Sequence, residues 1–84
     1  EPIETRRYWF KKEITLETNH TVNMLNLVEG YEVIITSPTN QFEPYIIHYA
    51  ETFIIPASID SYSIKPVKPT DKPYGIIKAY IRER

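Results

Sequence analysis

Few side chains in this sequence could carry catalytic or metal chemistry. The chain has no cysteine, and its only histidines are His20 and His48. A zinc site needs several histidine, cysteine or carboxylate side chains that converge on one point. His20 lies in a short polar turn and His48 ends a short apolar run, so we expect both to be hydrogen-bonded surface residues rather than ligands.

The acidic residues do not suggest a catalytic pair. Glu43, Glu51 and Asp60 all fall at predicted turns, and no spacing sets two of them apart for general acid–base catalysis. The two glycines, Gly30 and Gly75, lie outside any phosphate-binding loop, and no Gly-x-Ser-x-Gly motif is present. We therefore expect no catalytic residue and treat the carboxylates as solvated loop charges.

Binding to nucleic acid or to a membrane is equally unsupported. The net charge is −1, and the one basic cluster combines Arg6 and Arg7 with Lys11 and Lys12, whereas nucleic-acid binding requires a sustained basic face. An oligonucleotide-binding barrel is therefore the least favoured function. No apolar run approaches the roughly 20 residues that span a bilayer. The sequence predicts no nucleic-acid or membrane partner, and the lack of cysteine fits a cytoplasmic location.

The length, the opening segment and the aromatic residues bear on domain organisation rather than on chemistry. Eighty-four residues are enough for one small domain, residues 1–84. The opening segment, residues 1–5, has no initiator methionine and leads straight into a strand pattern, so we expect the chain to be part of a longer protein. The seven tyrosines and Trp9 could stack on sugars or bases, but in a β-rich domain they more often pack within the core.

Strand-forming residues dominate, and no window sustains a helical period. Residues 30–31 are predicted to form a bend in a ribbon or a tight hairpin corner, and the three-proline segment 65–73 a loop or an edge. Short strands separated by turns indicate an all-β sandwich or barrel. The predicted strands are 7–16, 21–29, 31–36, 45–47, 52–55, one that begins at 62, and 76–82.

Two predicted strands are apolar on both faces. Val22, Met24 and Val28 alternate with Leu25 and Leu27 along residues 22–28, and in the last strand Ile76 and Tyr80 oppose Ile77 and Ile81. A lone small barrel needs only one apolar face, so the second indicates cover by another domain or subunit. Alternatively, so small a barrel simply exposes some apolar side chains.

Four segments, taken in order, carry a resemblance to a known family. They are Tyr8–Ile14, Leu27–Gly30, Ala50–Ala57 and Ile76–Ile81. With these segments the sequence resembles the cupins, and more closely the C-terminal domain of type I mannose-6-phosphate isomerases. The resemblance implies a small cupin-like jelly roll, a β-barrel of short antiparallel strands.

The departures from the cupin pattern concern the metal site. In a metal-binding cupin the ligands would fall near Leu16, Thr18 and Asn23 and at Ser61, and none of these is a ligand of the expected type. His48 precedes the motif strand, on the wrong side to replace the missing histidine. The resemblance thus implies that this chain holds no catalytic, cofactor-binding or metal-binding residue.

The resemblance also implies a role and a partner. A parent isomerase would interconvert mannose 6-phosphate and fructose 6-phosphate, with zinc bound in an upstream catalytic cupin. This chain would pack against that domain, in the same chain or in another subunit, as a non-catalytic barrel. Segment 48–62 would then be scaffold, with Phe53 and Ile55 pointing one way and Ile54 the other. The alternative is a free-standing sugar-binding, small-molecule-binding or sensor module.

Overall fold

Eight β-strands form the molecule in the computed structural model, which describes residues 2–81. No helix occurs among these residues. The all-β expectation is therefore confirmed. The strands are β1 (Ile3–Phe10), β2 (Ile14–Glu17), β3 (Asn23–Glu29), β4 (Glu32–Thr36), β5 (Tyr45–His48), β6 (Thr52–Ile55), β7 (Ser61–Pro66) and β8 (Tyr74–Ile81).

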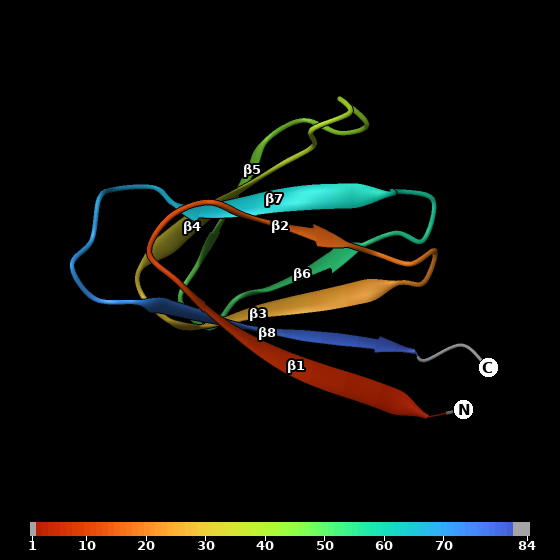
Figure 1. Ribbon diagram of the computed structural model, residues 1–84, viewed down its shortest axis with the longest axis horizontal. Helices are drawn as coiled ribbons and strands as arrows, with labels where there is room; N and C mark the ends of the chain where they lie inside the picture. The colour runs from red at the N-terminus through yellow and green to blue at the C-terminus, as the bar shows by residue number, and fades with distance from the viewer. Residues whose placement is uncertain (1, 82–84) are drawn as a thin grey trace.

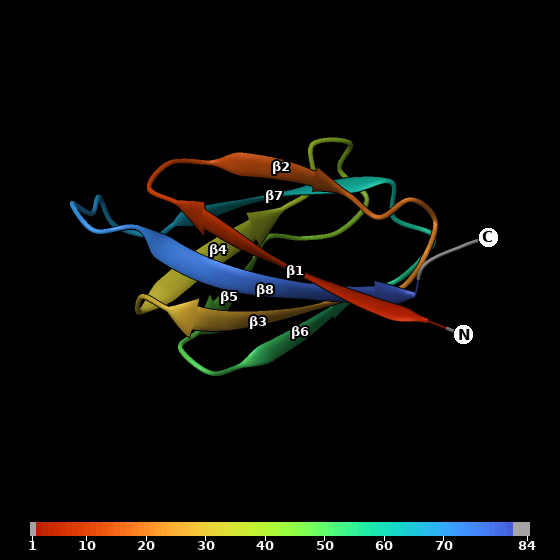
Figure 2. The ribbon, with the colours of Figure 1, turned by 60° about the horizontal axis from the view of Figure 1, so that its bottom comes forward.

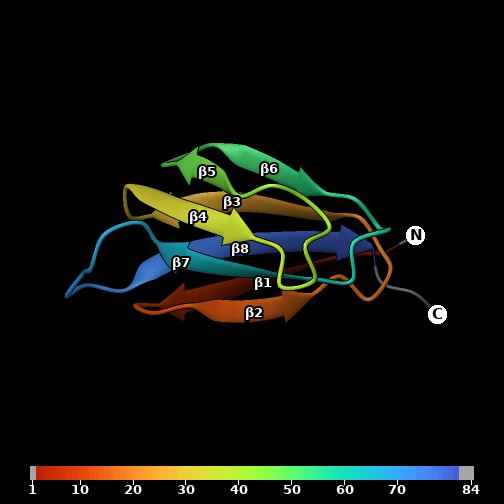
Figure 3. The same ribbon diagram turned by 90° about the horizontal axis from the view of Figure 1, so that it is seen from above.

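The strands pair into two four-stranded antiparallel sheets that face each other (Figure 1). The first sheet has the order β1-β8-β3-β6, and Figure 2 turns its outer face toward the viewer. The second sheet has the order β2-β7-β4-β5 and is seen from above in Figure 3. Consecutive strands mostly lie in opposite sheets, so the chain crosses repeatedly between the layers, as in a jelly roll.

The strand predicted over residues 7–16 is wrong as a single element. It is two strands in two sheets: β1 pairs with β8 and β2 pairs with β7, and residues 11–13 form the bend between them. The apolar alternation nevertheless continues across the bend, because Tyr8, Phe10, Ile14 and Leu16 all pack against the core. Alternation of apolar and polar residues cannot reveal this bend, because the even-numbered side chains face the core on both sides of it.

Other boundaries shift by one or two residues. Residues 30–31 form a corner between sheets rather than a paired hairpin, because β3 and β4 belong to different sheets. The proline segment begins within β7, which ends at Pro66, and then forms a loop. The last strand begins at Tyr74, and its predicted end at Arg82 lies outside the described residues.

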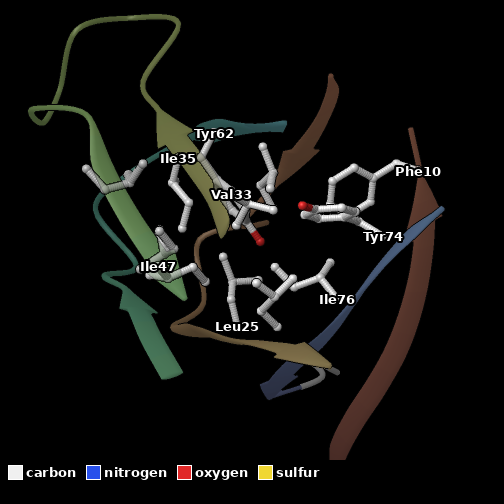
Figure 4. Packing of buried hydrophobic residues seen from close by; sticks show 12 residues of the cluster. Phe10, Leu25, Val33, Ile35, Ile47, Tyr62, Tyr74 and Ile76 are labelled. Carbon is white, nitrogen blue, oxygen red and sulfur yellow. The ribbon is translucent and has the colours of Figure 1, made fainter. Parts of the chain in front are cut away.

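The core fills the space between the sheets (Figure 4). Large side chains from both inner faces meet there, and Tyr62 and Ile76 are fully buried among them. In β6 the predicted facing is confirmed, since Ile55 is buried and Phe53 packs on the core while Ile54 is exposed. The fully buried apolar members are Leu25, Leu27, Val33, Ile35, Ile47, Ile55, Tyr62, Ile64 and Ile76.

Candidate functional site

Two of the four positions where a cupin would hold a metal, Thr18 and Asn23, belong to a buried hydrogen-bond network. The Thr18 hydroxyl donates to the carbonyl of Ile59, and the Asn23 side-chain amide donates to the carbonyl of Thr21 over 3.0 Å. Both Thr18 and Asn23 are fully buried. Among the described residues, no buried side-chain nitrogen or oxygen lacks a partner. These groups tie the β2–β3 turn to the segment before β7, which is a structural role.

Tyr62 closes this network from inside the sandwich. Its hydroxyl donates to Asn23 Oδ1 over 2.9 Å, and its ring fills the core beside Val33 (Figure 4). Burial, with a smaller contribution from Tyr8, raises the pKa of the Tyr62 phenol far above its ordinary value. The neighbouring Ser61 is half-buried and lies opposite Glu17 of β2. The phenol is thus a neutral hydrogen-bond donor that fixes the Asn23 side chain.

His48 makes two ion pairs at the opposite end of the sandwich. Its Nδ1 is 3.0 Å from Glu51 Oε1, and its Nε2 is 3.0 Å from Glu32 Oε2. The Glu51 carboxylate also accepts the His48 backbone N–H over 2.7 Å. The hydrogen bond to Glu51 is the largest cause that raises the pKa of His48. The backbone N–H of His48, followed by its ring, lowers the pKa of Glu51. The doubly protonated imidazole, in which both ring nitrogens donate, therefore persists to a higher pH than in an unpaired histidine.

The two histidines cannot share a ligand. His20 lies in the β2–β3 turn just before β3, at a positive φ of 63°. His48 ends β5 and lies opposite Glu32, the residue that begins β4 soon after β3 ends. The length of β3 separates them, which is about 20 Å at the usual rise per residue. Within residues 2–81, no three histidine or acidic side chains gather so as to hold a metal ion.

Of the three predicted loop carboxylates, only Glu51 has an ionic partner within residues 2–81. Glu43 is exposed in the β4–β5 connection, and Asp60 is exposed with its backbone N–H bound to Gln41 Oε1 over 3.2 Å. Sequence reasoning missed Glu32, which reaches His48 only through the β4–β5 register.

Lys78 is a second residue that the sequence did not single out. It points inward from β8 and is buried, with Nζ donating to the Glu17 carbonyl over 2.7 Å and lying 5.1 Å from the Tyr80 ring centre. Burial lowers its pKa, and the nearby Arg6 guanidinium adds to the effect. This lysine joins β8 of the first sheet to β2 of the second.

The residues of the predicted basic cluster do not form one surface. The Arg6 Nε donates to the Tyr80 hydroxyl over 2.9 Å on the inner side of β1. Arg7 points the other way, with its guanidinium carbon 5.6 Å from the centre of the Trp9 ring. Lys11 and Lys12 belong to the bend after β1. The two arginines therefore lie on opposite sides of β1.

The outer face of the first sheet is largely apolar. Met24 of β3 lies between Ile54 of β6 and Ala79 of β8 in register, and Ile3 of β1 pairs with Ile81 of β8. Met24 and Ile54 are 47% and 57% exposed. We call this surface the outer apolar face. Its exposed large members are Ile3, Trp9, Val22, Met24, Ile54 and Ile81.

A hollow opens at the end of the sandwich where β8 begins, with Tyr74 in its lining. Its volume is about 860 Å³, and it lies between the β3–β4 corner, the turn after β5 and the loop that precedes β8. Tyr31, Tyr49 and Tyr74 supply aromatic surface to it. It is separate from the Thr18–Asn23 network, which lies at the start of β3.

No family model matches the sequence, and no curated protein matches it. None of the described residues forms a helix that could cross a membrane. The fold does match a solved structure, a cupin-2 domain containing protein from Shewanella frigidimarina NCIMB 400. The TM-score is 0.70 with 14% sequence identity, over 95% of this chain and 71% of that one. This chain therefore has a cupin-like fold of two antiparallel sheets.

Proposed function

We propose that this chain is a non-catalytic cupin-like module that packs through its outer apolar face against an adjoining domain. The observation that carries the proposal is the exposure of large apolar side chains at neighbouring positions on three strands, β3, β6 and β8. Met24 and Ile54 are directly opposite each other, and Ile81 lies on the same face. Contiguous exposed apolar surface of this kind is typical of protein–protein contacts.

The interior of the module supports a scaffold role. The expected metal positions carry Leu16, Thr18, Asn23 and Ser61. The two buried polar residues among them, Thr18 and Asn23, are engaged in hydrogen bonds. Neither leucine nor a hydrogen-bonded threonine or asparagine offers the nitrogen or carboxylate ligand that zinc prefers. Any chemistry of a parent protein would then take place in another domain.

The resemblance to type I mannose-6-phosphate isomerases supports a finer proposal about that parent. The chain would be the C-terminal barrel of a zinc-dependent isomerase that interconverts mannose 6-phosphate and fructose 6-phosphate. Its partner would be the upstream catalytic cupin, in the same chain or in another subunit. An intact gene that encodes no upstream Gln-x-His zinc motif would remove the support for this parentage.

The packing proposal is tested with the upstream domain of the same gene, produced separately and mixed with this chain. Binding measured by calorimetry should be abolished by Met24→Glu or Ile54→Glu, because a carboxylate cannot be buried unpaired in an apolar contact. Ile46→Glu is the matched control, since Ile46 is similarly exposed, at 42%, but lies on β5 of the second sheet. Equal weakening by all three substitutions, or none by the first two, would contradict the proposal.

The alternative function is a free-standing module that binds a sugar or another small molecule. The hollow beside Tyr31 and Tyr49 supports it, because pockets of about 300–1,000 Å³ are the usual size for small ligands. This function and the packing function use different surfaces, so each can be tested without the other.

A further inference from the structure

The rim of the hollow carries two aromatic rings that the fold does not use. Tyr31 is 83% exposed and Tyr49 is 61% exposed. Neither hydroxyl has a hydrogen-bond partner among the described residues, and neither ring belongs to the core. The Tyr49 backbone N–H donates to the Tyr31 carbonyl over 2.9 Å, so the two residues are held side by side. Exposed tyrosines fixed at a hollow offer flat apolar surface with a polar edge.

The opposite wall is a loop with little freedom to move. The Val67 N–H donates to the Glu32 carbonyl over 3.1 Å and ties the loop to the start of β4. Within the loop, the Thr70 hydroxyl donates to the Lys72 carbonyl over 2.9 Å and accepts the Lys72 N–H over 3.1 Å. Pro69 and Pro73 restrict the backbone further. A ligand would find this wall largely formed, which reduces the ordering cost of binding.

The charges around the hollow favour a ligand without net charge. Its lining includes the ammonium groups of Lys68 and Lys72 and the carboxylates of Glu29, Glu32 and Asp71. An anion would face the carboxylates, and a cation would face the lysines. A neutral molecule with several hydroxyl groups satisfies both signs, because each hydroxyl can donate to a carboxylate and accept from an ammonium group.

We propose that this hollow binds a neutral saccharide. One sugar ring would lie with its C–H face on Tyr31 or Tyr49, and its hydroxyl groups would bond to Lys68, Lys72 and Asp71. The inference rests on the binding-module alternative and is independent of packing through the outer apolar face.

The test is a titration of the ¹⁵N-labelled 84-residue chain, followed by the chemical shifts of its backbone amides. The probes are D-mannose, D-glucose and maltotriose, with mannose 6-phosphate as the charged counterpart of mannose. At least one neutral sugar should shift amides in segments 30–32, 49–50 and 67–74, and mannose 6-phosphate should bind more weakly than mannose. Shifts in these segments with mannose 6-phosphate alone would overturn the neutral-sugar proposal but support the binding module. No shift there with any probe would overturn the neutral-sugar proposal and restrict the binding module to ligands other than sugars.

Substitutions then locate the stacking surface. Tyr31→Ala and Tyr49→Ala should each leave the amide spectrum dispersed. At least one of them should weaken sugar binding by about fivefold or more, because it removes the aromatic ring on which the sugar stacks. Tyr45→Ala is the matched control, because Tyr45 is an exposed tyrosine on β5 outside the hollow. Unchanged affinity in both rim variants, or an equal loss in the Tyr45 variant, would overturn the proposal.

Discussion

The ring of Tyr74 lies directly against the backbone of Gly30, at the corner where the chain passes from the first sheet to the second. A Cβ atom placed on Gly30 would be 2.4 Å from Tyr74 Cδ2, and Gly30 has a φ of +106°. Both conditions exclude a side chain, because L-residues rarely adopt this conformation and the ring already occupies the space. The contact holds β3, β4 and the start of β8 together.

Gly30→Ala is therefore expected to lower the free energy of unfolding by about 2–4 kcal/mol, from backbone strain combined with overpacking against Tyr74. Chemical denaturation followed by circular dichroism measures the change.

Gly75→Ala is the matched control for this corner. A Cβ there would be 2.8 Å from Cζ3 of Trp9, whose exposed ring can swing toward solvent. The loss should therefore be clearly smaller than at Gly30. Equal losses at the two glycines would show that strain at the corner is not the dominant effect.

The hydrogen bond from Tyr62 to Asn23 gives a second prediction. Tyr62→Phe keeps the ring in the core but leaves Asn23 Oδ1 buried without its donor. The free energy of unfolding should fall by about 1–3 kcal/mol, the usual cost of an unsatisfied buried acceptor. Tyr45→Phe, which removes a hydroxyl without a described partner, should change it little. If Tyr62→Phe left the free energy of unfolding unchanged, solvent would have to reach the Asn23 side chain in place of the lost hydroxyl.

Zinc content gives a third prediction. The positions of the expected ligands carry Leu16, Thr18, Asn23 and Ser61, and His48 is already paired with Glu32. After incubation with zinc and dialysis, metal analysis should find far less than one zinc per chain. One zinc per chain, retained after dialysis and lost in His48→Ala, would contradict this and point to the two ion pairs as a metal site.

The sequence predicted short strands and their inward faces well, but it did not predict bends or the burial of a charged side chain. Thr52–Ile55 was predicted to the residue, because turn signals flank a short apolar run and alternation alone sets which side chains face inward. The bend at residues 11–13 was not predicted, because the even-numbered residues are the apolar, inward-facing ones both before and after it. In β8 both faces are apolar, so alternation did not reveal that Lys78 points inward.

The candidate sites depend on long-range register, which sequence patterns do not contain. Glu32 reaches His48 only because β4 and β5 pair with these two residues opposite each other. The hollow likewise requires the corner at Gly30 and the loop before Tyr74 to meet, although they are far apart in the chain. Single-residue chemistry could identify His48 as a hydrogen-bonded residue, but not its partners.

The ion pairs of His48 predict a specific pH dependence. Because the folded state raises the pKa of His48 above 6.5, this pairing stabilises the fold below that value and is lost as the pH rises through the folded pKa. Glu51 has a lowered pKa, so its contribution is present above 4.5 and is lost as the pH falls through the folded pKa. The two contributions coexist between these values, on the acidic side of neutrality.

His48→Ala should therefore lower the melting temperature more at about pH 5.5 than at about pH 8. All three side chains are solvent-exposed, so salt screens the pairs and the difference should shrink at high ionic strength. His20→Ala serves as the control, because it replaces the other histidine and removes no ion pair among the described residues. A loss in His48→Ala that is equal at both pH values and insensitive to salt would assign His48 a packing role instead of an ionic one.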